Sequence, residues 1–208
     1  MNRLDRWIVE FDRALRTMAA PARATRPSPA APWPDTPLDD AEKAHVGRLM
    51  RINHTGEICA QALYQGQALT ARVAANREAL RGAAQEEEDH LAWCEQRIAE
   101  LGGRTSWLNP FWYAGSLALG VLAGIAGDRW NLAFLKETER QVETHLEGHL
   151  ARIPEQDRRT RAVIEQMKAD EAGHAALAQS LGAAEFPGLV KGAMAWSSRL
   201  MTRTVYWV

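Results

Sequence analysis

The sequence predicts an all-α protein built as a helical bundle. Apolar residues recur at the spacing of amphipathic helices, and no stretch shows the strict alternation of a half-buried strand. Glycine and proline fall between these periodic stretches, where they end helices. Hydrophobic residues make up 46% of the 208-residue chain and charged residues 25%, which suits one globular core with tails.

The first 38 residues are expected to stand apart from a bundle domain at 39–208. Residues 2–19 have apolar groups at helical spacing and predict a short amphipathic helix, while residues 20–38 contain six prolines and are typical of a linker. Residues 1–30 and 186–208 each carry a net charge of +3. Basic ends favour contact with an anionic surface such as a membrane leaflet, with a merely solvated surface as the alternative.

Four long helices and a C-terminal helical segment are predicted for the bundle domain. Asp39 and Asp40 can cap the first helix, and Gly102 with Gly103 ends the second. Pro154 separates the last two long helices. The four predicted helices cover residues 41–71, 77–101, 129–152 and 156–181.

The segment between the second and third long helices is unusual because residues 105–127 contain no charged residue. Trp107 and Trp112 lie near one end and Trp130 lies just past the other. Apolar length with flanking aromatic residues is typical of membrane contact. A transmembrane span, a helix in the membrane interface and a buried core helix all remain open at this point.

Pairs of Glu and His at i, i+3 are candidate metal ligands, because both side chains lie on one helix face. The chain has 17 Glu and 6 His, so chance placement predicts roughly half a Glu-x-x-His, and the chain contains three. Glu42 and His45 form a pair at a helix start that we interpret as a surface pair. The other two pairs are Glu87 with His90 and Glu171 with His174.

The repeated order of these ligands is the stronger signal. Glu57 precedes the first pair by 30 residues, and Glu139 precedes the second by 32. A di-iron carboxylate bundle, the ferritin-like arrangement, needs a lone Glu from two helices and a Glu-x-x-His pair from the other two. Spacing alone does not separate Glu139 from its neighbours on the same predicted helix, which are Glu137, Glu143 and Glu147.

At these positions the sequence resembles the demethoxyubiquinone hydroxylases, the di-iron monooxygenases of ubiquinone biosynthesis. The resemblance covers about residues 40–208 and lies in four motifs, at 51–57, 86–90, 137–145 and 170–174. It implies that the iron ligands are Glu57, Glu87, His90, Glu139, Glu171 and His174. It also implies that Glu87 and Glu171 bridge the two iron ions and that His145 lies near the substrate, although Leu146 stands where some members have Tyr.

The resemblance implies a reaction in which O2 hydroxylates a polyprenyl-methoxy-methyl-benzoquinol, with two Fe ions as cofactor and other ubiquinone-biosynthesis proteins as candidate partners. A single transmembrane span at 105–127 would place Glu57 and Glu171 on opposite sides of the membrane, so one metal site could not form. We therefore expect this segment to be an extra apolar helix in the crossover, lying in the membrane interface.

Localisation follows from the same observations. Only two cysteines are present, Cys59 and Cys94, which make neither a disulfide framework nor a zinc site. We expect a peripheral protein on the cytoplasmic face of the bacterial inner membrane. The net charge of -1 gives no indication of nucleic-acid binding. A ferritin-like iron oxidase or storage protein and a metal-free helical membrane-interaction protein remain as alternatives.

Overall fold

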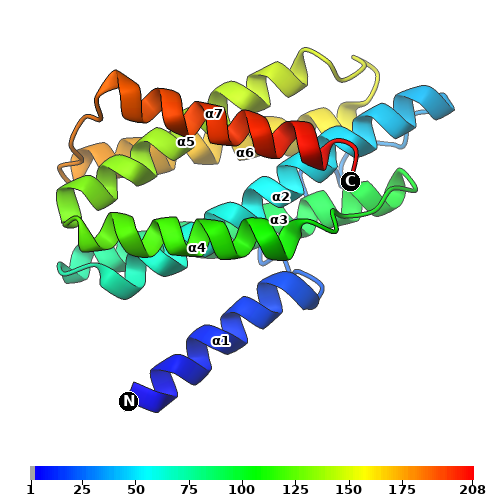
Figure 1. The fold of residues 1–208 in the computed structure, drawn as a ribbon. Helices are drawn as coiled ribbons and strands as arrows, with labels where there is room; N and C mark the ends of the chain where they lie inside the picture. Colours follow the sequence, from blue (N-terminus) through cyan, green and yellow to red (C-terminus); the bar gives the residue numbers. More distant parts are fainter. Residues whose placement is uncertain (1–2) are drawn as a thin grey trace.

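A computed structural model describes residues 3–208, and every regular element in that range is a helix. The described chain runs through α1 Arg3–Ala19, α2 Asp40–Thr70, α3 Ala74–Glu100, α4 Asn109–Ile125, α5 Asp128–Leu150, α6 Arg158–Ser180 and α7 Gly188–Val205. The all-α prediction is confirmed, and the four long helices begin and end within three residues of the predicted bounds. Figure 1 shows α2, α3, α5 and α6 as the bundle, with α1 extending away from it.

Local sequence explains where the bundle helices begin and turn. Asp39 caps α2: its carboxylate accepts from the backbone N–H of Glu42, whose own carboxylate accepts from the N–H of Asp39. Gly127 joins α4 to α5 with φ of +108°, a conformation that favours glycine. These signals produce two helical hairpins, α2–α3 and α5–α6, joined by α4.

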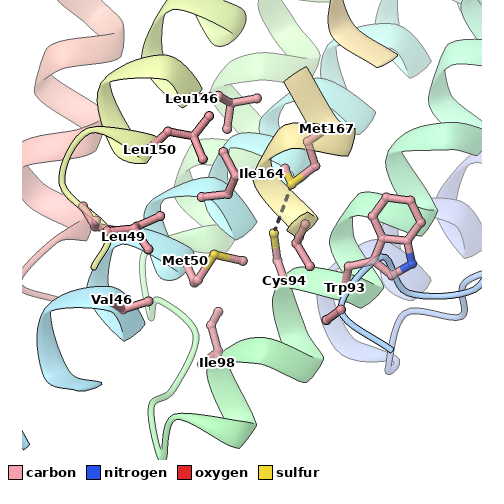
Figure 2. Packing of buried hydrophobic residues seen from close by; sticks show 13 residues of the cluster. Val46, Leu49, Met50, Trp93, Cys94, Ile98, Leu146, Leu150, Ile164 and Met167 are labelled. Atoms are coloured by element: carbon pink, nitrogen blue, oxygen red, sulfur yellow. Dashed lines mark hydrogen bonds between the residues drawn. The ribbon is translucent and has the colours of Figure 1, made fainter. Parts of the chain in front are cut away.

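Two of the apolar clusters formed by the described residues fill the two ends of the bundle and leave a polar layer between them. One contains Leu49 and Met50 of α2, and Figure 2 shows its Cys94 sulfur directed at the Met167 sulfur, 3.9 Å away. The other contains Leu80 and Leu135 near the opposite end. Along each of the four helices, the predicted metal ligands fall between the residues of these two clusters.

Helix α4 lies against α2 through glycine contacts. A Cβ built on Gly120 would overlap the backbone carbonyl oxygen of Leu63, and one built on Gly66 would overlap the backbone of α4. The other side of α4 exposes apolar residues such as Phe111 and Leu122. The alternative of a buried core helix therefore holds only for the face of α4 that packs against α2. Within residues 3–208, none of the helices combines the length and hydropathy needed to cross a membrane.

Residues 20–38, which were expected to be a linker, form no helix but contact the bundle. Ala30 is buried in the cluster of Figure 2, and Arg26 forms ion pairs with Asp89 of α3 and Asp170 of α6. The segment therefore lies across the α3–α6 side instead of only connecting α1 to the bundle.

Candidate metal centre

The six predicted ligands come together in the polar layer of the bundle. They form two overlapping groups in which the candidate ligand atoms all lie within 4.8 Å of one another. Glu87 and Glu171 belong to both groups, which is the arrangement expected of the bridging ligands that the resemblance implies. The first group is completed by Glu57 and His90, and the second by Glu139 and His174.

The two histidines occupy equivalent positions on opposite sides of the bridging carboxylates. His90 Nδ1 lies 3.0 Å from Glu87 Oε2 and 3.5 Å from Glu171 Oε1. His174 Nδ1 lies 3.4 Å from a carboxylate oxygen of each of the same two residues. Because both Nδ1 atoms face the carboxylates, the site has an approximate two-fold arrangement suited to two ions.

Whether this donor set fits metal ions can be judged from the buried polar atoms that have no hydrogen-bond partner. Glu87 Oε1, Glu171 Oε2 and His174 Nδ1 are buried and have no hydrogen-bond partner within the described chain. Buried polar atoms without partners are costly, and here they are the atoms that face the shared space. Four carboxylates and two imidazoles form a donor set that suits a pair of first-row divalent cations.

The electrostatics of the cluster favour cations. Burial, followed by repulsion from Glu87, raises the pKa of Glu57 well above its ordinary value. Burial and repulsion from Glu171 raise the pKa of Glu139 in the same way. The pKa of His90 is raised although burial opposes its charge, because the surrounding carboxylates attract the proton. Divalent cations would relieve the same crowding of negative charge.

Two further carboxylates contact the Nε2 atoms of the two histidines, and each comes from the helix opposite its histidine. His90 on α3 has its Nε2 2.9 Å from Asp170 of α6, and His174 on α6 has its Nε2 3.3 Å from Glu86 of α3. Such partners fix the tautomer of a ligating imidazole and direct its other nitrogen to the metal. Sequence reasoning missed both carboxylates, although each immediately precedes the Glu of a Glu-x-x-His pair.

Tyr64 is a further residue that sequence reasoning missed. Its buried hydroxyl donates to Glu139 Oε1, and burial raises the pKa of this phenol well above its usual value. Tyr64 lies seven residues after Glu57, two helical turns along the same face of α2, which is the signal that would have found it.

The neighbours of Glu139 on α5 have other partners. Glu137 accepts from the side chain of Gln141 and lies 3.4 Å from Lys191, while Glu147 binds Lys168. Glu143 belongs to neither metal-binding group found among the described residues. Glu139 is therefore the α5 carboxylate that lies in a candidate metal-binding group, a distinction that spacing alone does not make.

Glu42 and His45 also lie outside the cluster. His45 Nδ1 is 2.8 Å from the Tyr206 hydroxyl, and Glu42 completes the cap of α2. Their interpretation as a pair at the helix start agrees with these contacts.

A cavity of about 190 Å³ adjoins the metal cluster. Its lining includes Glu57 from the cluster, His145 of α5, and apolar side chains such as Leu119 of α4 and Met201 of α7. Burial, with a smaller contribution from Arg152, lowers the pKa of His145 to about 4, so its imidazole is neutral at pH 7. The cavity therefore joins one metal ligand, one neutral imidazole and the space between α4 and α7.

Comparisons with known proteins agree with this geometry. The family model described as ubiquinone biosynthesis protein COQ7 matches residues 44–205. The chain is 60% identical over 208 residues, the whole of both chains, to the 3-demethoxyubiquinol 3-hydroxylase of Nitrosomonas europaea. It is 61% identical over 203 residues to the protein of that name from Laribacter hongkongensis and 59% identical over 203 residues to that of Aromatoleum aromaticum, with 98% of each chain covered in both cases.

Proposed function

The chain belongs to the family of the ubiquinone biosynthesis protein COQ7, and from that premise we propose that it hydroxylates 3-demethoxyubiquinol at two iron ions. The observation that carries the proposal is the convergence of six buried Glu and His side chains from α2, α3, α5 and α6. The relatives' shared name is that of a hydroxylase, which favours this reading over the iron-storage and metal-free alternatives.

Within this proposal, Glu57 and His90 hold one iron, Glu139 and His174 hold the other, and Glu87 and Glu171 bridge them. Carboxylate and imidazole ligands from facing helices are the usual set for a di-iron centre in a helical bundle. Bound iron would supply the activation of O2 that an organic side chain does not provide. The protein supplies a buried site with fixed ligands, and Asp170 and Glu86 keep the two imidazoles in the ligating orientation.

The cavity supports a position for the quinol ring between Glu57 and His145. Glu57 is the one proposed ligand that also lines the cavity. His145 Nε2 has no hydrogen-bond partner among the described residues, and a neutral imidazole offers both a donor and an acceptor to a quinol hydroxyl. The apolar side chains of α4 and α7 would exclude water around the ring and guide the isoprenoid tail outward.

Peripheral contact with the membrane is part of the same proposal. α4 and α7 lie on the near side of the bundle in Figure 1, and the cavity is lined from both. Trp107, Leu189 and Trp196 expose 77%, 86% and 65% of their surface. Residues 186–208 carry three basic and no acidic side chains, which suits an anionic leaflet. We propose that this side rests on the cytoplasmic face of the bacterial inner membrane, where the substrate's tail is dissolved.

The quinone content of a deletion strain tests the function. Loss of the chain should make demethoxyubiquinone accumulate, and the wild-type chain should restore ubiquinone while Glu171→Ala should not. The control is Glu165→Ala, since Glu165 is an exposed carboxylate on the same helix. Purified wild-type protein should bind about two irons per chain after reconstitution. An unchanged quinone profile in the deletion strain, or restoration by Glu171→Ala, would contradict the proposal.

A further inference from the structure

Arg26 connects the N-terminal segment to both hairpins of the bundle. Its Nε donates to Asp89 Oδ2 of α3 at 2.6 Å, and its Nη1 donates to Asp170 Oδ2 of α6 at 2.9 Å. The backbone N–H and hydroxyl of Thr25 also donate to Asp89. A planar guanidinium suits such a bridge, because its donors point in fixed directions toward two acceptors.

The same contacts reach a proposed iron ligand. Asp170 Oδ2, which accepts from Arg26, lies 2.9 Å from His90 Nε2. A second route runs through Trp93, because the Arg26 guanidinium lies 4.9 Å from the centre of the Trp93 ring and that ring lies 5.5 Å from the His90 ring. Arg26 therefore restrains the position of His90 both through a carboxylate and through packing.

The equivalent position on the other side of the centre has no such restraint. His174 Nε2 lies 3.3 Å from Glu86, whose side chain is 47% exposed. Within residues 3–208, no Lys or Arg forms an ion pair with Glu86. Asp170 is 12% exposed and also accepts from the Gln166 amide at 2.9 Å. The ligands themselves have an approximate two-fold arrangement, but the carboxylates that contact the Nε2 atoms of the two histidines differ in exposure and in their own partners.

We propose that Arg26 is a positioning residue that holds Asp170 on His90 and so makes the His90 position bind its iron more tightly than the His174 position. The inference rests on the proposed di-iron function. Partners behind a ligating histidine change metal affinity by about 10- to 100-fold, and a partner fixed by a guanidinium loses less conformational freedom when the metal binds. Arg26 lies outside residues 44–205, the part of the chain that the family model matches, and it is not one of the six proposed ligands.

Release of ferrous iron to a coloured chelator, measured anaerobically on fully loaded protein, tests the proposal. The wild-type protein should release its two irons in two phases of equal amplitude. Arg26→Gln should accelerate the slow phase about 10- to 100-fold and leave the fast phase unchanged. Arg26→Lys should lie between the two, because lysine keeps the charge but not the planar fork. Glu86→Gln should accelerate the fast phase only.

The matched control is Arg16→Gln, since Arg16 forms an exposed ion pair with Asp12 on α1, away from the iron ligands. It should leave both phases unchanged. Melting temperatures measured in parallel show whether a variant is folded, and Arg26→Lys serves as the test if Arg26→Gln does not fold. A single phase in wild-type protein, or equal acceleration of both phases by the Arg26 variant, would overturn the inference. Wild-type protein that binds no iron would instead overturn the proposed function.

Discussion

The candidate metal centre and the α4–α7 side are opposite in character although the same cavity touches both. The centre buries charge: Glu57, Glu87, Glu139 and Glu171 are each at most 3% exposed. The α4–α7 side exposes apolar surface, and the 23 residues from 105 to 127 carry no charge at all. In the carboxylate cluster, ionisable groups are buried away from water. On the α4–α7 side, apolar groups are exposed to water.

Both arrangements are unfavourable in water alone, and this shared property connects them to function. Crowded buried carboxylates are costly without cations, and large exposed apolar patches are unusual on a soluble monomer. Each region would therefore suit a different one of the proposed partners, metal ions in one case and lipid in the other. The cavity between Glu57 and α7 is where a substrate with a polar ring and an apolar tail would meet both.

The largest effect is expected from removing a bridging ligand. Glu87→Ala should abolish binding of both irons and lower hydroxylase activity by at least roughly a thousandfold, because the carboxylate belongs to both metal groups. Iron content by elemental analysis and quinol hydroxylation measure the result. The control Glu78→Ala removes an exposed carboxylate from the same helix and should change neither. Two irons retained by Glu87→Ala would show that the buried charge serves another purpose.

The next effect concerns how firmly α4 belongs to the bundle. Gly120→Val should destabilise the protein by about 3 kcal/mol, because its side chain would overlap the backbone of Leu63 and push α4 away from α2. Gly115→Ala, on the same helix, meets open space and should change stability by less than about 1 kcal/mol. Urea unfolding of both variants provides the measurement. Equal stabilities of the two variants would mean that α4 does not pack tightly against α2, and would contradict the prediction.

The contrast between the regions also shows what a sequence can predict. The six candidate ligands could be predicted from the sequence because Glu and His have few structural reasons to repeat in the order Glu … Glu-x-x-His. Asp170 and Arg26 were missed because their role depends on which side chains meet across helices and on a 20–38 segment that was expected to be only a linker. Selection of Glu139 needed either the resemblance or the structure, since several Glu share its helix.

The apolar segment shows a different limit. Its lack of charge was evident, but residues 105–127 do not encode by composition which face meets α2. That depends on the close approach of Gly66 and Gly120, which only the folded backbone reveals. A single helix of this kind is compatible with core or interface until its neighbours are known. Contact of 105–127 with a membrane therefore stays a prediction that the next experiment tests.

A smaller effect is expected on membrane binding. Trp107→Ser combined with Trp196→Ser should weaken binding to vesicles of phosphatidylethanolamine and phosphatidylglycerol by about tenfold or more, since the two side chains together would contribute about 3–6 kcal/mol if fully buried and less when they lie only partly in the interface. Iron content should stay unchanged. Trp33→Ser, on the 20–38 segment beside Arg158, is the control and should bind as wild type does. Vesicle flotation measures the fraction of protein bound. Unchanged binding of the double variant would contradict the proposal that the α4–α7 side contacts the membrane.

The smallest effect concerns His149, a buried polar residue that resembles neither region. Both of its ring nitrogens lack hydrogen-bond partners in the described chain, and its ring centre is 4.0 Å from that of His145. Burial lowers the pKa of His149 to about 2, with smaller contributions from repulsion by His145 when it is protonated, by Arg152, and by His45 when it is protonated. The imidazole is therefore neutral in the folded protein at pH 7.

This neutrality makes stability depend on pH with a definite sign. The unfolded chain binds a proton at His149 below about pH 6.5 and the folded chain does not, so acid favours unfolding from that pH down to the folded pKa of about 2. His149→Leu removes this contribution. Between pH 7.5 and 5.5 the wild-type protein should lose about 1.4 kcal/mol more than the variant, measured by urea unfolding with chelator present so that metal loss does not enter. Parallel losses in the two proteins would mean that the folded protein binds a proton at His149 as readily as the unfolded chain does, and would contradict the prediction.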